Sequence, residues 1–150
     1  MKALQVLIPP VYLLISLLLM LVLHYQLPLL RLIPAPYSYT GISLIIAGLC
    51  LAILGAGMFR RADTPVRPFR KSTTLVVHGL FRYSRNPMYL GLLLALLGTA
   101  ILLGSLSPFL VIPVFFVIIR EGYVKHEERF LEELFGDAYR SYKQRVRRWF

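Results

Sequence analysis

Basic, aromatic and turn-forming residues cluster in the stretch HGLFRYSRNPMYLG, residues 78–91, immediately before a long apolar run. Its Arg85 carries a guanidinium, which can bind a carboxylate through two parallel hydrogen bonds. Its Tyr83 and Tyr89 carry aromatic faces and hydroxyl groups, which can contact a ring or donate a hydrogen bond. The stretch therefore offers a site for a charged, polar ligand at a membrane boundary, although such residues also serve simply as interfacial anchors.

Two adjacent carboxylates, Glu127 and Glu128, provide complementary chemistry further along the chain. A carboxylate can accept hydrogen bonds from hydroxyl groups, pair with an ammonium group or take a proton from a nucleophile. Neighbouring residues of a helix point about 100° apart. We therefore expect one glutamate to touch a ligand, while the other fixes Arg85, His78 or a backbone donor.

The elements that must position these residues are membrane helices. Of the 150 residues 57% are hydrophobic, which is too apolar for a soluble domain of this size. Long apolar runs predict about four transmembrane helices, because a bilayer core requires about 20 apolar residues. The expected helices cover residues 4–30, 39–59, 87–104 and 107–124, with a loop over 60–86 and a helical C-terminal segment over 125–150. We expect one all-α membrane domain over residues 1–150.

The fourth helix is unusual, because the uncharged run from Pro108 to Ile119 is too short to span a bilayer alone. Arg120 and Glu121 follow it directly. Either the helix is only partly embedded, or these two charges lie near the cytoplasmic boundary. There they would face the protein interior or snorkel to the interface.

Positive charges set the expected orientation. The net charge is +10, and arginines and lysines concentrate in the loop and in the C-terminal segment, whereas the first hairpin holds only Arg31. The positive-inside rule therefore places the loop and both termini in the cytoplasm, with the basic residues against anionic lipids. Because these charges flank membrane segments, we expect no nucleic-acid partner. Cys50 and the scattered histidines lack the spacing of a zinc site, so we expect no metal.

Small residues recur at helical spacing in the second and third apolar runs, which predicts close packing of these helices. They are Gly41, Gly48, Ala52 and Gly55, then Gly91, Ala95 and Gly98. In the C-terminal segment, residues 121–135 predict a helix with an apolar face that extends into the cytoplasm. Gly136 suits its C-cap, Asp137 suits the N-cap of a second short helix, and Trp149 suits an interfacial anchor.

Two motifs resemble the isoprenylcysteine carboxyl methyltransferase superfamily, which includes phospholipid methyltransferases and small bacterial members. The first, G-x-[YF]-x-x-x-R-[HN]-P-x-Y-x-G, is matched by Gly79, Phe81, Arg85, Asn86, Pro87, Tyr89 and Gly91. The second motif lies further along the chain and reads E-E-x-x-L-x-x-x-[FY]-G-x-x-[YF]-x-x-Y-x-x-x-V-x-R. It is matched by Glu127, Glu128, Leu131, Phe135, Gly136, Tyr139, Tyr142, Val146 and Arg148. The resemblance covers roughly residues 59–148 and includes the upstream run FRRADTPVRPF.

The resemblance implies methyl transfer from S-adenosylmethionine to a lipophilic acceptor at the cytoplasmic face of a bacterial inner membrane. It implies Arg85, Glu127 and Glu128 as catalytic residues. It implies a cofactor site formed by His78, Gly79, Tyr83, Arg85, Asn86, Pro87, Tyr89, Gly91, Glu127 and Glu128. The acceptor is expected to enter laterally between the third and fourth helices.

One departure bears on the acceptor. Isoprenylcysteine enzymes generally read Arg-His-Pro where this chain reads Arg85-Asn86-Pro87, which is closer to phospholipid methyltransferases and bacterial members. We therefore expect a lipid amine or an apolar thiol or acid as the acceptor, and an isoprenylcysteine carboxylate is less favoured. The oligomeric state is left open. Two alternatives are a non-catalytic membrane protein, such as an assembly partner, and an NADPH-dependent membrane reductase of related architecture.

Overall fold

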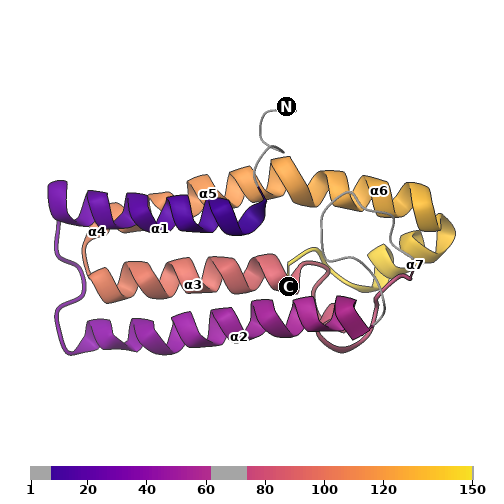
Figure 1. Cartoon of the computed structure of the whole chain (residues 1–150), viewed down its shortest axis with the longest axis horizontal. Helices are drawn as coiled ribbons and strands as arrows, with labels where there is room; N and C mark the ends of the chain where they lie inside the picture. Colours follow the sequence, from indigo (N-terminus) through magenta and orange to yellow (C-terminus); the bar gives the residue numbers. More distant parts are fainter. Residues whose placement is uncertain (1–7, 62–73, 150) are drawn as a thin grey trace.

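Helix α3 lies at the centre of a bundle of long helices that run along one common axis (Figure 1). The computed structural model describes residues 8–61 and 74–149, and these residues contain no strand. The long helices are α1 (Pro9–Gln26), α2 (Thr40–Arg61), α3 (Pro87–Leu103) and a continuous helical stretch over Leu106–Phe135. The predicted all-α class is therefore confirmed.

The last long stretch consists of four consecutive helical segments. They are α4 (Leu106–Phe109), α5 (Val111–Ile119), the π-helical turn η4 (Arg120–Val124) and α6 (Lys125–Phe135). A short helix, α7 (Asp137–Arg145), follows, and two 3₁₀ turns, η2 (Tyr37–Tyr39) and η3 (Gly79–Arg82), precede α2 and α3.

Three of the described helices are long and apolar enough to cross a membrane: Pro9–Gln26, Tyr37–Arg61 and Leu106–Phe135. Helix α3, with 17 residues, is shorter. The sequence had suggested that the fourth helix would be the short one. Instead, the backbone stays helical through the charged residues after Ile119, so this helix reaches 30 residues.

Arg120 and Glu121 lie on the surface of the fourth helix. Their side chains are 43% and 42% exposed, and Arg120 Nε lies 3.6 Å from a Glu121 carboxylate oxygen. Lys125 Nζ lies 2.6 Å from the other oxygen of Glu121. The alternative in which these charges face the protein interior is therefore wrong, and exposed pairing at little energetic cost replaces it.

Helix α1 ends at Gln26, before the predicted end at residue 30. Pro28 explains this difference, because the residue before a proline avoids the α-helical conformation. Leu27 accordingly has φ −144° and ψ 67°. The helix begins at Pro9, where a proline is tolerated, and residues 4–7 of the predicted span lie outside the described residues.

Helices α2 and α3 approach each other along the predicted stripes of small residues. A methyl group on Gly48 would lie 2.6 Å from the backbone nitrogen of Ala95, and one on Gly91 would lie 2.7 Å from that of Ala52. Only residues without a side chain permit such an approach. The prediction that these stripes pack the bundle is confirmed.

The opposite side of α3 packs against α1 and α5. Met20, Leu96, Phe115 and Ile119 are fully buried at this junction. The outward faces of α1 and α2 instead expose large apolar side chains, which suit contact with hydrocarbon. They include Leu14, Leu18, Val22, Ile46 and Leu54. The chain is an integral membrane protein.

The C-terminal segment differs from one expectation. Gly136, with φ 52°, ends α6 and also caps the start of α7, so Asp137 is the first residue of that helix rather than its N-cap. Trp149 packs against the bundle, since its ring centroid lies 5.2 Å from that of Phe116, and its role as an interfacial anchor stays a prediction.

Candidate active site

The end of the chain closes over the loop that leads into α3. The C-terminal strap, residues 146–149, is held there by backbone carbonyl groups. The Arg148 carbonyl accepts hydrogen bonds from Ser84 Oγ at 3.2 Å and from Asn86 Nδ2 at 3.0 Å. The backbone N–H of Arg85 donates to the Arg147 carbonyl at 3.1 Å. The strap thereby fixes the residues immediately before the first turn of α3.

A carboxylate held between two guanidinium groups forms the centre of the site. Glu128, on α6, accepts hydrogen bonds from Arg148 Nε at 3.0 Å and from an Arg148 Nη atom at 2.6 Å. An Arg85 Nη atom lies 3.2 Å from a Glu128 oxygen, and both of these side chains are only 8% exposed. The helix, the loop and the strap therefore meet at one buried charge cluster.

The cluster carries more positive than negative charge, since two guanidinium groups share one carboxylate. Hydrogen bonding to Glu128 raises the pKa of Arg148, so this arginine stays charged. Within the described part of the chain, the buried Arg85 Nε has no hydrogen-bond partner. A buried donor without a partner is costly, and the guanidinium therefore suits a further anionic acceptor.

Two buried tyrosines of α7 support this cluster. Burial raises the pKa of Tyr139 to about 12 and that of Tyr142 further still, so both phenols are protonated near neutral pH. Tyr142 Oη donates a 2.6 Å hydrogen bond to the backbone carbonyl of Phe81 in η3. Helix α7 is thus fastened to the loop that carries Arg85.

The second glutamate points to a different partner. Tyr89 Oη donates a 2.9 Å hydrogen bond to a Glu127 carboxylate oxygen, which joins the first turn of α3 to α6. Glu128 meanwhile pairs with Arg85. The two neighbouring carboxylates therefore point in different directions, as expected for adjacent residues of a helix. Glu128 binds the Arg85 guanidinium, whereas Glu127 accepts a hydrogen bond from the Tyr89 hydroxyl.

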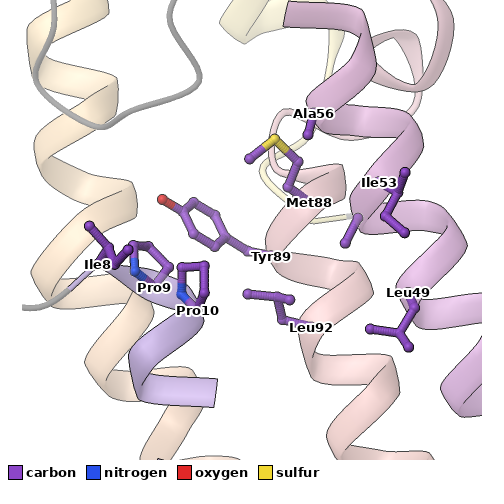
Figure 2. Close-up of a pocket in the computed structure, with 10 residues that line it drawn as sticks. Ile8, Pro9, Pro10, Leu49, Ile53, Ala56, Met88, Tyr89 and Leu92 are labelled. Atoms are coloured by element: carbon purple, nitrogen blue, oxygen red, sulfur yellow. The ribbon is translucent and has the colours of Figure 1, made fainter. Parts of the chain in front are cut away.

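An apolar pocket of about 390 Å³ adjoins Tyr89. It is lined by Ile8, Pro9, Pro10, Leu49, Ala52, Ile53, Ala56, Met88, Tyr89 and Leu92. Figure 2 shows the Tyr89 ring extending from α3 toward the start of α1, with Met88, Ala56, Ile53 and Leu92 on its other side. The pocket lies among α1, α2 and α3, and lateral entry of the acceptor between the third and fourth helices stays a prediction.

The structure brings most of the predicted site residues together. Arg85, Asn86, Pro87, Tyr89, Glu127 and Glu128 gather where α3 begins beside α6. His78 and Gly79 are exposed, and Tyr83 is 80% exposed. Gly91 faces α2, where its lack of a side chain admits Gly48 and Ala52. Gly91 therefore has a packing role in this arrangement.

Sequence reasoning had not placed Arg148 in the site, nor Ser84. The signal for Arg148 was its position at the end of the distal motif, where Val146-x-Arg148 follows the tyrosines of α7. Ser84 had no signal, because a serine in a loop is common and its contact with the strap depends on folding.

The sequence model of the phospholipid methyltransferase family matches residues 37–138. The chain belongs to this family. The match includes α2, α3, the fourth helix and all the predicted site residues, whereas α1 and the C-terminal strap lie outside it. Both sides of the Tyr89–Glu127 hydrogen bond fall within the family segment.

Similar proteins include enzymes with several acceptors. The chain is 33% identical over 76 residues to a protein-S-isoprenylcysteine O-methyltransferase of Schizosaccharomyces pombe, covering 51% of this chain and 32% of that protein. It is 34% identical over 67 residues to methanethiol S-methyltransferase 1 of Bradyrhizobium diazoefficiens, covering 45% of this chain and 22% of that enzyme.

A longer match joins the chain to a probable protein-S-isoprenylcysteine O-methyltransferase of Oryza sativa subsp. indica. The two are 30% identical over 113 residues, which cover 73% of this chain and 58% of the rice protein. The chain thus covers less than two thirds of the length of each of these named methyltransferases. No solved structure matches the chain.

Proposed function

We propose that the protein transfers a methyl group from S-adenosylmethionine to a lipophilic acceptor at the cytoplasmic face of the membrane. Family membership supports methyl transfer, and the similar proteins are named for methylation of isoprenylcysteine and methanethiol. The apolar exterior of the bundle supports an acceptor that reaches the protein through the bilayer.

The observation that carries the proposal is the unpartnered Nε of the buried Arg85. S-adenosylmethionine bears a carboxylate, which matches an excess of positive charge and a free guanidinium donor. In this proposal Arg85 binds that carboxylate. Glu128 positions Arg85, because it lies 3.2 Å from the guanidinium and is itself held by Arg148. The residues present therefore fit this cofactor.

The bound cofactor would supply an electrophilic methyl group on a sulfonium centre. The protein's own work is then to align the acceptor, exclude water and receive a proton where the acceptor carries one. Glu127 suits the last task better than the other candidates. Glu128 is engaged by two guanidinium groups, and His78 is exposed.

The Asn86 side chain does not distinguish between the acceptor classes in this proposal. Its amide donates to the Arg148 carbonyl and so fastens the strap. A neutral amide can do this at any physiological pH. The proposed acceptors therefore comprise lipid amines, apolar thiols or acids, and isoprenylcysteine carboxylates. Location in a bacterial inner membrane belongs to the same proposal.

The test combines binding and product analysis. Protein in nanodiscs is titrated with S-adenosylmethionine in a calorimeter, and we expect micromolar affinity, equivalent to roughly −7 to −8 kcal/mol.

Membranes with and without the protein are then incubated with methyl-labelled cofactor and extracted with organic solvent. Label in the lipid phase that depends on the protein indicates a small lipophilic acceptor. Label confined to a protein band, and released by mild base, indicates a carboxyl methyl ester. Folded protein that neither binds the cofactor nor transfers label contradicts the proposal.

A further inference from the structure

The pocket beside Tyr89 has the character of a binding site for hydrocarbon. Its volume, about 390 Å³, lies within the range of roughly 300–1,000 Å³ that is typical of small-molecule pockets. Among its lining residues, Tyr89 alone has a polar side-chain atom. A charged headgroup in such a pocket would lose its hydration without gaining partners. The occupant must therefore present apolar surface to most of the wall.

We propose that this pocket holds the hydrocarbon part of the methyl acceptor, and that the start of α1 together with Ala56 of α2 determines which acceptors fit. The inference rests on the proposed function, since it assigns a substrate site to the same reaction. It goes beyond the family match, because Ile8, Pro9 and Pro10 precede the matched segment.

The rim of the pocket identifies the bilayer as the source of the occupant. Ile8 is 56% exposed and Ile53 is 69% exposed, and both line the pocket. They continue the apolar outer faces of α1 and α2. A hydrocarbon chain can therefore move from the membrane into the pocket without crossing polar surface.

The contacts of Tyr89 set the orientation of this occupant. Its ring forms part of the pocket wall, while its hydroxyl group reaches Glu127. Glu127 is followed directly by Glu128, which holds Arg85. An acceptor with its apolar part in the pocket thus presents its nucleophilic atom at the Tyr89 hydroxyl, on the side of the charge cluster.

Two features of the wall set its size. Pro9 and Pro10 have restricted backbone torsions, so the α1 side is stiff. On α2, Ala52 and Ala56 are small, but Ala52 also packs against Gly91. Ala56 is therefore the position at which added bulk narrows the pocket with least disturbance of the α2–α3 packing.

The experiment uses a photoactivatable probe, dodecylamine with a diazirine on its chain, added to the full-length protein in nanodiscs. Wild type is compared with Ala56→Phe and with the matched control Ala47→Phe, whose alanine is exposed on the same helix and does not line the pocket. Ile53→Trp, at the exposed rim, is a second variant. Crosslinked residues are located by peptide mass spectrometry, and S-adenosylmethionine binding is measured in parallel.

We expect adducts on Met88 and Leu92 in wild type and in Ala47→Phe. In Ala56→Phe they fall at least about tenfold, because the phenyl ring displaces several methylene groups of the probe. In Ile53→Trp they fall measurably. Cofactor affinity is expected to be equal in all four proteins.

Adducts spread evenly over lipid-facing residues in every variant would overturn the pocket assignment. If the wild-type protein does not bind S-adenosylmethionine but the pocket is still labelled selectively, the proposed function is contradicted instead. The two failures are therefore distinguishable.

Discussion

Arg148 holds Glu128 in a bidentate manner through one edge of its guanidinium, with Nε at 3.0 Å and an Nη atom at 2.6 Å from the two carboxylate oxygens. The same carboxylate lies 3.2 Å from Arg85. A residue of the C-terminal strap thus controls the orientation of the arginine that we assign to the cofactor carboxylate. The strap is part of the site, although it lies outside the segment that the family model matches.

Arg148→Ala should weaken cofactor binding about tenfold, because hydrogen bonds to a charged group contribute roughly 1.5–3 kcal/mol each and Arg148 is partly exposed. Arg148→Lys should recover little, since an ammonium cannot bind the carboxylate in a bidentate manner. Titration calorimetry measures both effects. Arg147→Ala is the matched control, because its side chain is exposed and only its carbonyl contacts Arg85. Unchanged affinity in both alanine variants would show that the strap acts through its backbone alone.

Arg85→Ala and Glu128→Ala should each weaken cofactor binding by about tenfold or more, because each change leaves a buried charge without its partner. Glu132→Ala and Glu133→Ala should have little effect. Glu132 pairs with Arg140 and Lys143 on the surface, where ion pairs contribute about 0–1 kcal/mol. The four variants are compared in one calorimetric series. If the Glu132 and Glu133 changes are as harmful as the others, the site is misplaced.

Tyr89→Phe should lower methyl transfer about tenfold or more while leaving cofactor affinity nearly unchanged. The change keeps the ring in the pocket wall but removes the hydrogen bond to Glu127, and a hydrogen bond to a charged group is worth roughly 1.5–3 kcal/mol. Rates with saturating labelled cofactor, beside calorimetry, separate the two quantities. Unaltered turnover would show that the Tyr89 hydroxyl takes no part in the reaction.

Gly48→Ala and Gly91→Ala should destabilise the bundle by about 1–3 kcal/mol, because the added methyl groups meet the backbone of the facing helix. Gly57→Ala is the matched control on α2, since a methyl group there has no heavy atom within 4 Å among the described residues. It should be neutral or stabilising by up to about 1 kcal/mol. Thermal unfolding in detergent provides the comparison, and equal stability of all three variants would contradict the close packing.

Reporter fusions at residue 105 and at the C-terminus should lie on opposite sides of the membrane. Ser105 pairs with Arg31 at one end of the bundle, while α7 lies at the other end (Figure 1). The basic residues Arg60 and Arg61 end α2 near α7, so the positive-inside rule predicts that this end of the bundle lies in the cytoplasm. Reporters on the same side would rule out the four-helix topology.

The sequence by itself determined the features that depend on local or periodic patterns. Hydropathy identified the membrane helices, the spacing of Gly48 and Gly91 indicated a close helix interface, and two motifs indicated the family. These features can be predicted from the sequence because a helix places regularly spaced residues on a single face. The expected end of α1 at residue 30 was wrong, because that expectation overlooked how Pro28 restricts the backbone of the residue before it.

Tertiary structure decided which charged residues meet. Glu128 pairs with Arg85 and Arg148, which are distant in the chain, and only the folded strap brings them together. Likewise, the number of uncharged residues made the fourth helix look short. Such a count does not take into account that Glu121 forms an ion pair with Lys125 on the surface of the helix. The pocket beside Tyr89 needs three helices to enclose it. Each of these features depends on the relative placement of separate helices, which no spacing within one segment specifies.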